Sequence, residues 1–272
     1  MNNKLVDILN RGIRYLRYIP SFFRWILTAK NWYEIIFLHL NLIRRDIHLN
    51  LRNGLNLRLM NRGENSDTVT LSELYWDKPY TKDGFDIKNN DIVVDIGANV
   101  GIFSTYAVKQ AKNVKVYSFE PSPATFKYLK SNIETNKLSS SIKIFNKAVA
   151  DKNGVLKLYL NEEIPVANSL YQNIAKSKNG KDEEVVSVTL KKIFKDNKLN
   201  KINFLKLDCE GAEYGILMKS PVELLNKIEK ISMEVHKIKG YSVQKLKNYL
   251  SGCGFEIKQF REIIHARRIN EI

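Results

Sequence analysis

Two acidic residues and two glycines between residues 91 and 121 have types and spacing that could bind a nucleoside carrying a positive charge. Asp95 stands two residues before Gly97, Gly101 follows four residues later, and Glu120 comes after a second apolar run. Glycines let the backbone approach a ligand closely, and a helix that begins there offers unpaired N–H groups. The Glu120 carboxylate can accept hydrogen bonds from both hydroxyls of a ribose.

The spacing within this turn distinguishes between two cofactors. A dinucleotide fingerprint has three glycines, so that a pyrophosphate can lie at the helix N-terminus, whereas Asn99 here occupies the position of the middle glycine. The Asp95 carboxylate would repel a pyrophosphate but attract an ammonium group. S-adenosylmethionine carries an amino-acid ammonium group at one end and a ribose at the other. The turn therefore predicts S-adenosylmethionine, held by Asp95, Gly97, Asn99, Gly101 and Glu120.

A second set of polar residues lies at the ends of two later apolar runs. Asp208 and Glu210 follow one run, and Glu234 and His236 end another. Methyl transfer to oxygen needs a hydroxyl held in line with the sulfonium methyl group and a base that takes its proton. Carboxylates, or a histidine that titrates near neutral pH, could be that base, so Asp208, Glu210 and His236 are candidate catalytic residues. The same acids could instead hold a divalent cation, but a salt-bridged network with Lys206 explains them too, and we expect no metal.

An alternation of strands and helices must position these residues, and it predicts an α/β fold. Such a chain forms an open, mostly parallel sheet with helices on both faces and right-handed crossovers. Ligands bind beyond the carboxyl ends of its strands, where Asn146 and Ala148 could read an adenine edge. The predicted strands are 92–97, 114–120, 142–149, 155–160, 185–189, 203–209, 229–235, 254–260 and 262–268, and the helices are 101–112, 122–137, 190–198, 212–226 and 242–252.

Three motifs resemble those of the FkbM-type S-adenosylmethionine-dependent methyltransferases, and the resemblance runs in register from about residue 70 to about residue 258. They are Val94–Ser104, Phe119–Pro121 and Phe204–Glu213. The resemblance implies a Rossmann-like class I methyltransferase fold, with a mostly parallel seven-stranded sheet. It also implies O-methylation of a small molecule or glycan, most directly at a sugar hydroxyl. One departure is Lys191, which follows Thr-Leu where many relatives have an acid.

The N-terminal quarter of the chain is strongly basic. Residues 1–62 hold 11 Lys and Arg against three Asp and Glu, a formal charge of +8 out of +15 for the whole chain. Residues 4–19 place basic side chains on one face of a helix and apolar ones on the other, and an aromatic cluster follows Pro20. This pattern predicts peripheral contact of residues 1–30 with an anionic membrane. Packing of the apolar face on the protein's own core or on a dimer partner is equally consistent with this pattern.

Changes of pattern divide the chain into three segments. Residues 46–60 alternate in polarity around Asn53-Gly54, which predicts a β-hairpin. We therefore expect a basic helical extension at 1–45, a hairpin and helix pre-domain at 46–90, and a cofactor-binding domain at 91–272. No apolar window is long enough for a spanning helix or signal peptide. The two cysteines offer no disulfide framework, which suggests a cytoplasmic protein, peripheral at the inner membrane surface.

Three functions are compatible with these features. Methyl transfer to a sugar or glycan hydroxyl agrees with the motifs, although the acceptor follows from the resemblance alone. Nucleic-acid methylation would agree with the basic charge, but base-modifying enzymes usually carry an Asn/Asp-Pro-Pro-aromatic motif where this chain has Asp208-Cys-Glu-Gly211. A membrane-surface binding protein without turnover is a third possibility, against which the number of polar groups at the cleft argues.

Overall fold

The computed structural model describes residues 19–39, 42–43, 45–61, 67–161, 168–175 and 181–269. The predicted helix at residues 4–19 therefore lies outside the described residues, except for its last residue. The chain divides into two compact units, Met1–Asn61 and Arg62–Ile272. The hairpin thus belongs with the N-terminal helices instead of with the segment up to residue 90. Within the described ranges, no helix combines the length and apolar character needed to cross a bilayer.

The first unit joins two short helices to the predicted hairpin. Its elements are α2 (Ile19–Thr28), α3 (Tyr33–His39), β1 (Ile47–Asn50) and β2 (Asn56–Leu59). The strands pair antiparallel, with Asn50 opposite Asn56, and Gly54 takes a left-handed φ of +89° in the turn between them. Alternate residues of both strands are buried. The hairpin prediction is therefore confirmed, and Trp25 of α2 and Ile35 of α3 are buried in the same unit.

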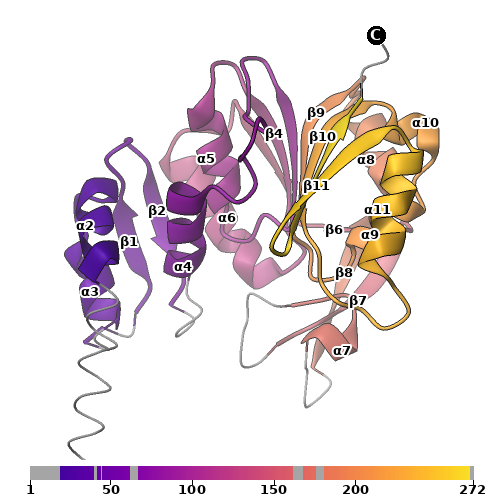
Figure 1. Ribbon diagram of the computed structural model, residues 1–272. Helices are drawn as coiled ribbons and strands as arrows, with labels where there is room; N and C mark the ends of the chain where they lie inside the picture. The colour runs from indigo at the N-terminus through magenta and orange to yellow at the C-terminus, as the bar shows by residue number, and fades with distance from the viewer. Residues whose placement is uncertain are drawn as a thin grey trace, which may run out of the picture. The chain divides into compact units, whose positions relative to one another are not determined.

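The second unit is organised around a seven-stranded sheet (Figure 1), as predicted. The strand order is β11-β12-β10-β9-β3-β4-β5, and every neighbouring pair is parallel except those that β12 makes with β10 and β11. The strands are β3 (Ile92–Ile96), β4 (Lys115–Phe119), β5 (Ile142–Phe145), β9 (Ile202–Leu207), β10 (Ile228–Glu234), β11 (Phe255–Phe260) and β12 (Ile263–Arg268).

Helices cover both faces of this sheet, with α5 and α6 on one face and α8, α9 and α11 on the other (Figure 1). One predicted helix, 212–226, is in fact two, because Pro221 lacks an N–H group and disfavours helical backbone in the residue before it. The helices of this unit are α4 (Asp67–Ser72), the π-helix η2 (Glu73–Asp77), α5 (Ile102–Gln110), α6 (Pro123–Thr135), α7 (Gln172–Ala175), α8 (Leu190–Asp196), α9 (Glu213–Met218), α10 (Val222–Leu225) and α11 (Val243–Gly252).

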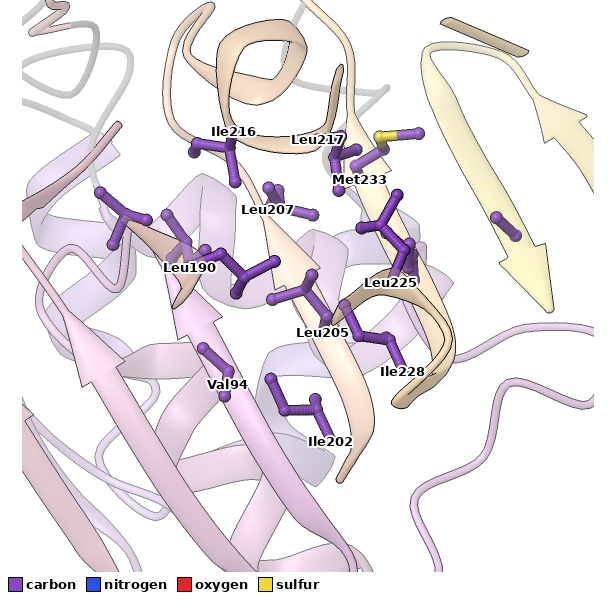
Figure 2. Close-up of a cluster of buried hydrophobic side chains, with 14 of the residues drawn as sticks. Val94, Leu190, Ile202, Leu205, Leu207, Ile216, Leu217, Leu225, Ile228 and Met233 are labelled. Carbon is purple, nitrogen blue, oxygen red and sulfur yellow. The ribbon is translucent and has the colours of Figure 1, made fainter. Parts of the chain in front are cut away.

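The hydrophobic core lies between the central strands and the helices α8 to α11 (Figure 2). Val94 of β3, Leu205 and Leu207 of β9 and Ile228 of β10 are all fully buried in it. Every residue of β9 is buried, as expected for a parallel strand covered on both faces. This packing fixes where β3 and β9 end, and therefore where the polar residues that follow them lie.

A small second sheet corrects the prediction of one strand at 142–149. The chain leaves the main sheet after β5, and Ala148–Val149 forms β6, which pairs with β8 (Asp182–Val188). Strand β7 (Gly154–Tyr159) completes this sheet in the order β6-β8-β7. Asn146 falls in the break between β5 and β6, where its side chain donates to backbone carbonyl oxygens of the segment after β4.

Candidate active site

A cavity of about 630 Å³ opens at the carboxyl ends of β3, β4, β9 and β10. The chain runs outward from β3 through β4 to β5, then returns to β9 on the other side of β3. The cavity therefore lies at the point where the strand order reverses, which is where open α/β sheets bind ligands. Its volume is in the range of small-molecule sites. Four predicted cofactor-binding residues line it, namely Gly97, Asn99, Glu120 and Ala148.

The turn after β3 is tied to Glu120 by backbone hydrogen bonds. Gly97 and Asn99 both take left-handed φ angles, +76° and +51°, which bend the chain sharply before α5. The Asn99 N–H donates to Glu120 Oε2 at 2.9 Å, and the Ser122 N–H donates to Oε1 at 2.9 Å. A carboxylate oxygen can accept more than one hydrogen bond. Glu120 can therefore hold the turn and still accept hydrogen bonds from a ribose.

Asp95 does not reach the cavity. Its carboxylate is fully buried, accepts a hydrogen bond from Ser104 Oγ at 2.6 Å, and lies 3.3 Å from Lys206 Nζ. The register of the sheet explains this pairing, because Asp95 of β3 lies opposite Lys206 of β9. The expected contact between Asp95 and a cofactor ammonium group is therefore not the arrangement that the structure shows. Asp95 instead supports the turn after β3 through Lys206, whose Nζ also donates to the Gly97 carbonyl oxygen.

Gly101 and Asn146 also lie outside the lining of the cavity. A Cβ atom on Gly101 would lie 2.6 Å from Leu129 Cδ1, so this glycine permits close packing of α5 on α6. Asn146 is exposed, and its Nδ2 donates to the carbonyl oxygens of Glu120 and Pro121 at 2.9 Å each. Both residues thus support the segments that follow β3 and β4 without lining the cavity.

The other side of the cavity is lined by carboxylates and one tyrosine. Asp208, Glu210 and Glu234 all line it. Tyr80 Oη donates to Asp208 Oδ2 at 3.0 Å and lies 3.3 Å from Glu234 Oε2. Burial, together with the charges of both acids, raises the pKa of Tyr80 well above its ordinary value, so it remains a hydrogen-bond donor. No sequence pattern predicted that Tyr80 would contact these acids, apart from its being an aromatic residue after Lys78-Pro79.

His236 lies between two glutamates, and its pKa is raised above the neutral range expected of a titrating base. Its Nε2 lies 3.2 Å from Glu210, and its Nδ1 lies 3.3 Å from the fully buried Glu213. Burial lowers the pKa of His236, but the hydrogen bond to Glu213 and the charges of Glu210, Glu213 and Asp208 outweigh burial and raise it to about 10. An imidazole that is already protonated cannot accept a proton from an acceptor hydroxyl.

Two glutamates are better placed to act as bases. Burial is the largest cause that raises the pKa of Glu210 to about 7, and repulsion from neighbouring carboxylates adds to it against the opposing charge of His236. Burial and the charge of Asp208 raise the pKa of Glu234 to about 7 in the same way. A general base works best when its pKa lies near the operating pH. Glu234, which the sequence suggested only as a metal ligand, therefore joins Glu210 and Asp208 as a candidate base.

A metal ion could also be held by three of these side chains, those of Asp208, Glu210 and His236. Each offers one ligand atom, and the three atoms lie within 4.8 Å of one another. Metal binding would require His236 to lose its proton, because only neutral imidazole coordinates a metal. The hydrogen bond to Glu213 and the charges of the neighbouring acids, which raise the pKa of His236, oppose that loss. The alternative to a metal, a salt-bridged network, also fits these contacts, and Lys206 joins that network at 3.6 Å from Asp208.

Comparison with known proteins identifies the family. The family described as Methyltransferase FkbM domain matches residues 95–257. The 31-O-demethyl-FK506 methyltransferase FkbM of Streptomyces tacrolimicus is 24% identical over 235 residues, which cover 77% of this chain and 88% of that protein. Methyltransferase sdnD of Sordaria araneosa is 29% identical over 212 residues, covering 67% and 81%.

A solved structure described as a methyltransferase FkbM, from Methylobacillus flagellatus KT, is 14% identical with a TM-score of 0.49. The superposition covers 94% of this chain and 60% of the other. The resemblance inferred from the motifs and the class I methyltransferase fold that it implied are both confirmed. The chain belongs to the FkbM methyltransferase family.

Proposed function

We propose that the protein transfers a methyl group from S-adenosylmethionine to a hydroxyl oxygen of an uncharged, hydroxyl-rich acceptor such as a sugar or glycan. One observation carries this proposal: a single cavity joins the turn that contacts Glu120 to the carboxylates Asp208, Glu210 and Glu234. The first group comes from β3 and β4, and the second follows β9 and β10. A cofactor and an acceptor bound on these two sides would meet above the point where the strand order reverses.

The residues on the cofactor side fit S-adenosylmethionine. The left-handed turn at Gly97 and Asn99 brings backbone to the cavity, and the Glu120 carboxylate suits the two ribose hydroxyls. When bound, this cofactor supplies a methyl group on a positively charged sulfur. Nearby carboxylates are favourable neighbours for that charge.

The residues on the acceptor side favour a hydroxyl over a phosphate. Among the described residues that line the cavity, acids outnumber Lys and Arg by seven to three. Carboxylates accept hydrogen bonds from hydroxyl groups and repel phosphates. Glu210 and Glu234, each with a pKa of about 7, can then take the proton that the hydroxyl loses. The name of the Streptomyces relative describes a substrate that lacks a methyl group on oxygen, which agrees with this chemistry.

Cofactor binding is tested by calorimetry with S-adenosylhomocysteine. Glu120→Ala should weaken binding by roughly 1.5–3 kcal/mol, the range for a lost hydrogen bond to a charged group. The exposed Glu134 of α6, which pairs with Lys130 at 3.9 Å, provides a control, because Glu134→Ala removes the same charge away from the cavity. Wild-type protein that binds neither S-adenosylmethionine nor S-adenosylhomocysteine would refute the proposal. Tighter binding of NAD would indicate a dehydrogenase.

The acceptor is tested with isotopically labelled cofactor and three matched pools: neutral glycans, phosphorylated sugars and RNA. We expect label in the neutral pool, on oxygen. Asp208→Asn and Glu234→Gln should each keep the affinity for S-adenosylhomocysteine, and at least one should lose about 100-fold in rate, as for removal of a general base. Label in RNA or in phosphorylated sugars alone would contradict the assignment of the acceptor.

A further inference from the structure

Lys206 contacts both sides of the cavity. Its Nζ donates to the Gly97 carbonyl oxygen at 2.9 Å, which belongs to the cofactor-side turn. The same nitrogen lies 3.3 Å from Asp95 Oδ1 and 3.6 Å from Asp208 Oδ2, on the acceptor side. One buried ammonium group therefore joins the turn after β3 to the carboxylate that follows β9.

The surroundings of Lys206 keep its ammonium group charged and fixed. The side chain is only 4% exposed, and Nζ lies 5.5 Å from the ring centre of Tyr80 and 5.9 Å from that of Phe103. Burial acts to lower its pKa, but the charges of Asp95 and Asp208 outweigh burial, so the pKa lies above its ordinary value. A buried ammonium group that lies between acidic side chains and aromatic rings has little freedom to move.

The two turns that Lys206 joins are also in direct backbone contact. The Asp208 N–H donates to the Ile96 carbonyl oxygen at 3.0 Å. A Cβ atom on Gly97 would lie 1.8 Å from the Asp208 carbonyl oxygen, so these backbones touch with no space between them. A shift of one turn would therefore move the other.

We infer that Lys206 is a positioning residue for methyl transfer, which clamps the cofactor-side turn at Gly97 to the acceptor-side carboxylate of Asp208. This inference rests on the proposed function. Within the described residues, Lys206 and Tyr80 both contact Oδ2 of Asp208, so Oδ1 is the oxygen that remains for an acceptor hydroxyl. The clamp thus fixes the turn that would hold the cofactor and the direction in which the Asp208 carboxylate faces. Misplacement by about 1 Å can lower a rate about 100-fold.

Lys206 also supplies positive charge to the acids around it. The charged and titratable groups that act on it are Asp95 of β3, Asp208 and Cys209 after β9, Glu234 of β10 and Tyr80. Its charge lowers the pKa of Glu234, against the burial that raises it. Removal of the ammonium group should therefore make these acids harder to ionise. A residue with a purely structural role would not produce that change.

The test is a double variant, Asp95→Asn with Lys206→Met, which removes both charges of the buried pair and leaves neither uncompensated. We expect affinity for S-adenosylhomocysteine to fall about tenfold and kcat about 100-fold. The acid limb of the kcat profile should move up by less than about one pH unit, because loss of the Lys206 charge raises the pKa of Glu234 and loss of the Asp95 charge partly offsets that change. Ser104→Ala is the matched control, because it removes a hydrogen bond from Asp95 in the same network without touching Lys206. It should lower thermal stability alone.

The results separate this inference from the proposed function. If the double variant melts at a lower temperature but keeps the wild-type kcat, KM and pH profile, Lys206 is structural and the inference fails. If the double variant does not fold, Lys206→Arg is measured instead, since it keeps the charge but cannot keep the position of the ammonium group. Unchanged kcat in that variant would also overturn the clamp. Wild-type protein that does not bind S-adenosylhomocysteine would refute the proposed function itself.

Discussion

Replacement of Gly97 by alanine should destabilise the protein far more than a typical substitution at a turn. Gly97 takes a φ of +76°, a left-handed conformation that L-residues rarely adopt. An added Cβ would lie 1.8 Å from the Asp208 carbonyl oxygen, whereas Cβ atoms in proteins essentially never come closer than 3.0 Å to such an atom. Since backbone atoms form this contact, the turn after β3 and the end of β9 would have to separate by more than 1 Å.

The cost of this separation can be worked out from the contacts that it breaks. The left-handed conformation costs an alanine about 1–2 kcal/mol. Separation also lengthens the hydrogen bond from Asp208 N–H to Ile96 and the one from Lys206 Nζ to Gly97, for which losses of about 1 kcal/mol and about 1.5 kcal/mol are typical. The total is about 4 kcal/mol, which corresponds to a melting temperature lower by about 10 °C in a chain of this size.

Chemical and thermal denaturation measure this loss, and Gly240→Ala is the control. Gly240 also has a left-handed φ, +89°, but a Cβ there would have nothing within 4 Å. It should therefore cost only the conformational part, about 1–2 kcal/mol. We also expect Gly97→Ala to weaken binding of S-adenosylhomocysteine, whereas Gly240→Ala should not. Equal destabilisation by the two variants would refute the close contact between the two turns as the reason for a glycine at position 97.

Three further outcomes are expected. The free energy of unfolding should fall as pH rises, because the folded protein binds protons more tightly than the unfolded chain at Glu210, with a pKa of about 7, and at His236, with a pKa of about 10. For each group, the loss occurs between its pKa in the unfolded chain and its pKa in the folded protein. His236→Gln should flatten the upper part of this pH curve. EDTA should leave methyl transfer unchanged, whereas loss restored by a divalent ion would make His236 and Glu210 metal ligands. The protein should sediment with anionic vesicles at low salt, because its N-terminal quarter is basic and Leu27 and Phe37 are exposed. Equal sedimentation of a Leu27→Ser, Phe37→Ser variant would show that these two side chains do not contact the membrane.

The elements that the sequence predicted well are those whose signals are local. The apolar run at β3, the turn at Gly97 and the Asn53-Gly54 hairpin each depend on a few neighbouring residues, and each is present as expected. The break after β5 was missed, because the apolar residues on either side of Asn146 suit one strand as well as two. The choice depends on β8, which offers a partner to β6 from a part of the chain almost 40 residues away.

The candidate site shows the same division between local and distant information. Gly97 and Glu120 could be assigned to the cavity because the turn itself carries the pattern. Asp95 could not be placed correctly, since its partner Lys206 comes from another strand, in register across the sheet. Tyr80 is separated from Asp208 by 128 positions, and no spacing rule connects them. The raised pKa of His236 likewise depends on its hydrogen bond to Glu213, whose burial only the folded chain reveals.

Net charge shows most clearly why a sequence total can mislead about a site. The chain carries +15, which on its own would favour an anionic acceptor such as a nucleic acid. More than half of that charge lies in residues 1–62, and the cavity is lined by residues of the second unit only. In the cavity the balance is reversed, and Lys206, one of its few cations, is paired with Asp95 and Asp208. An acceptor responds to the potential of the cavity that it enters, so the acidic lining, and not the basic total, is the better guide to its chemistry.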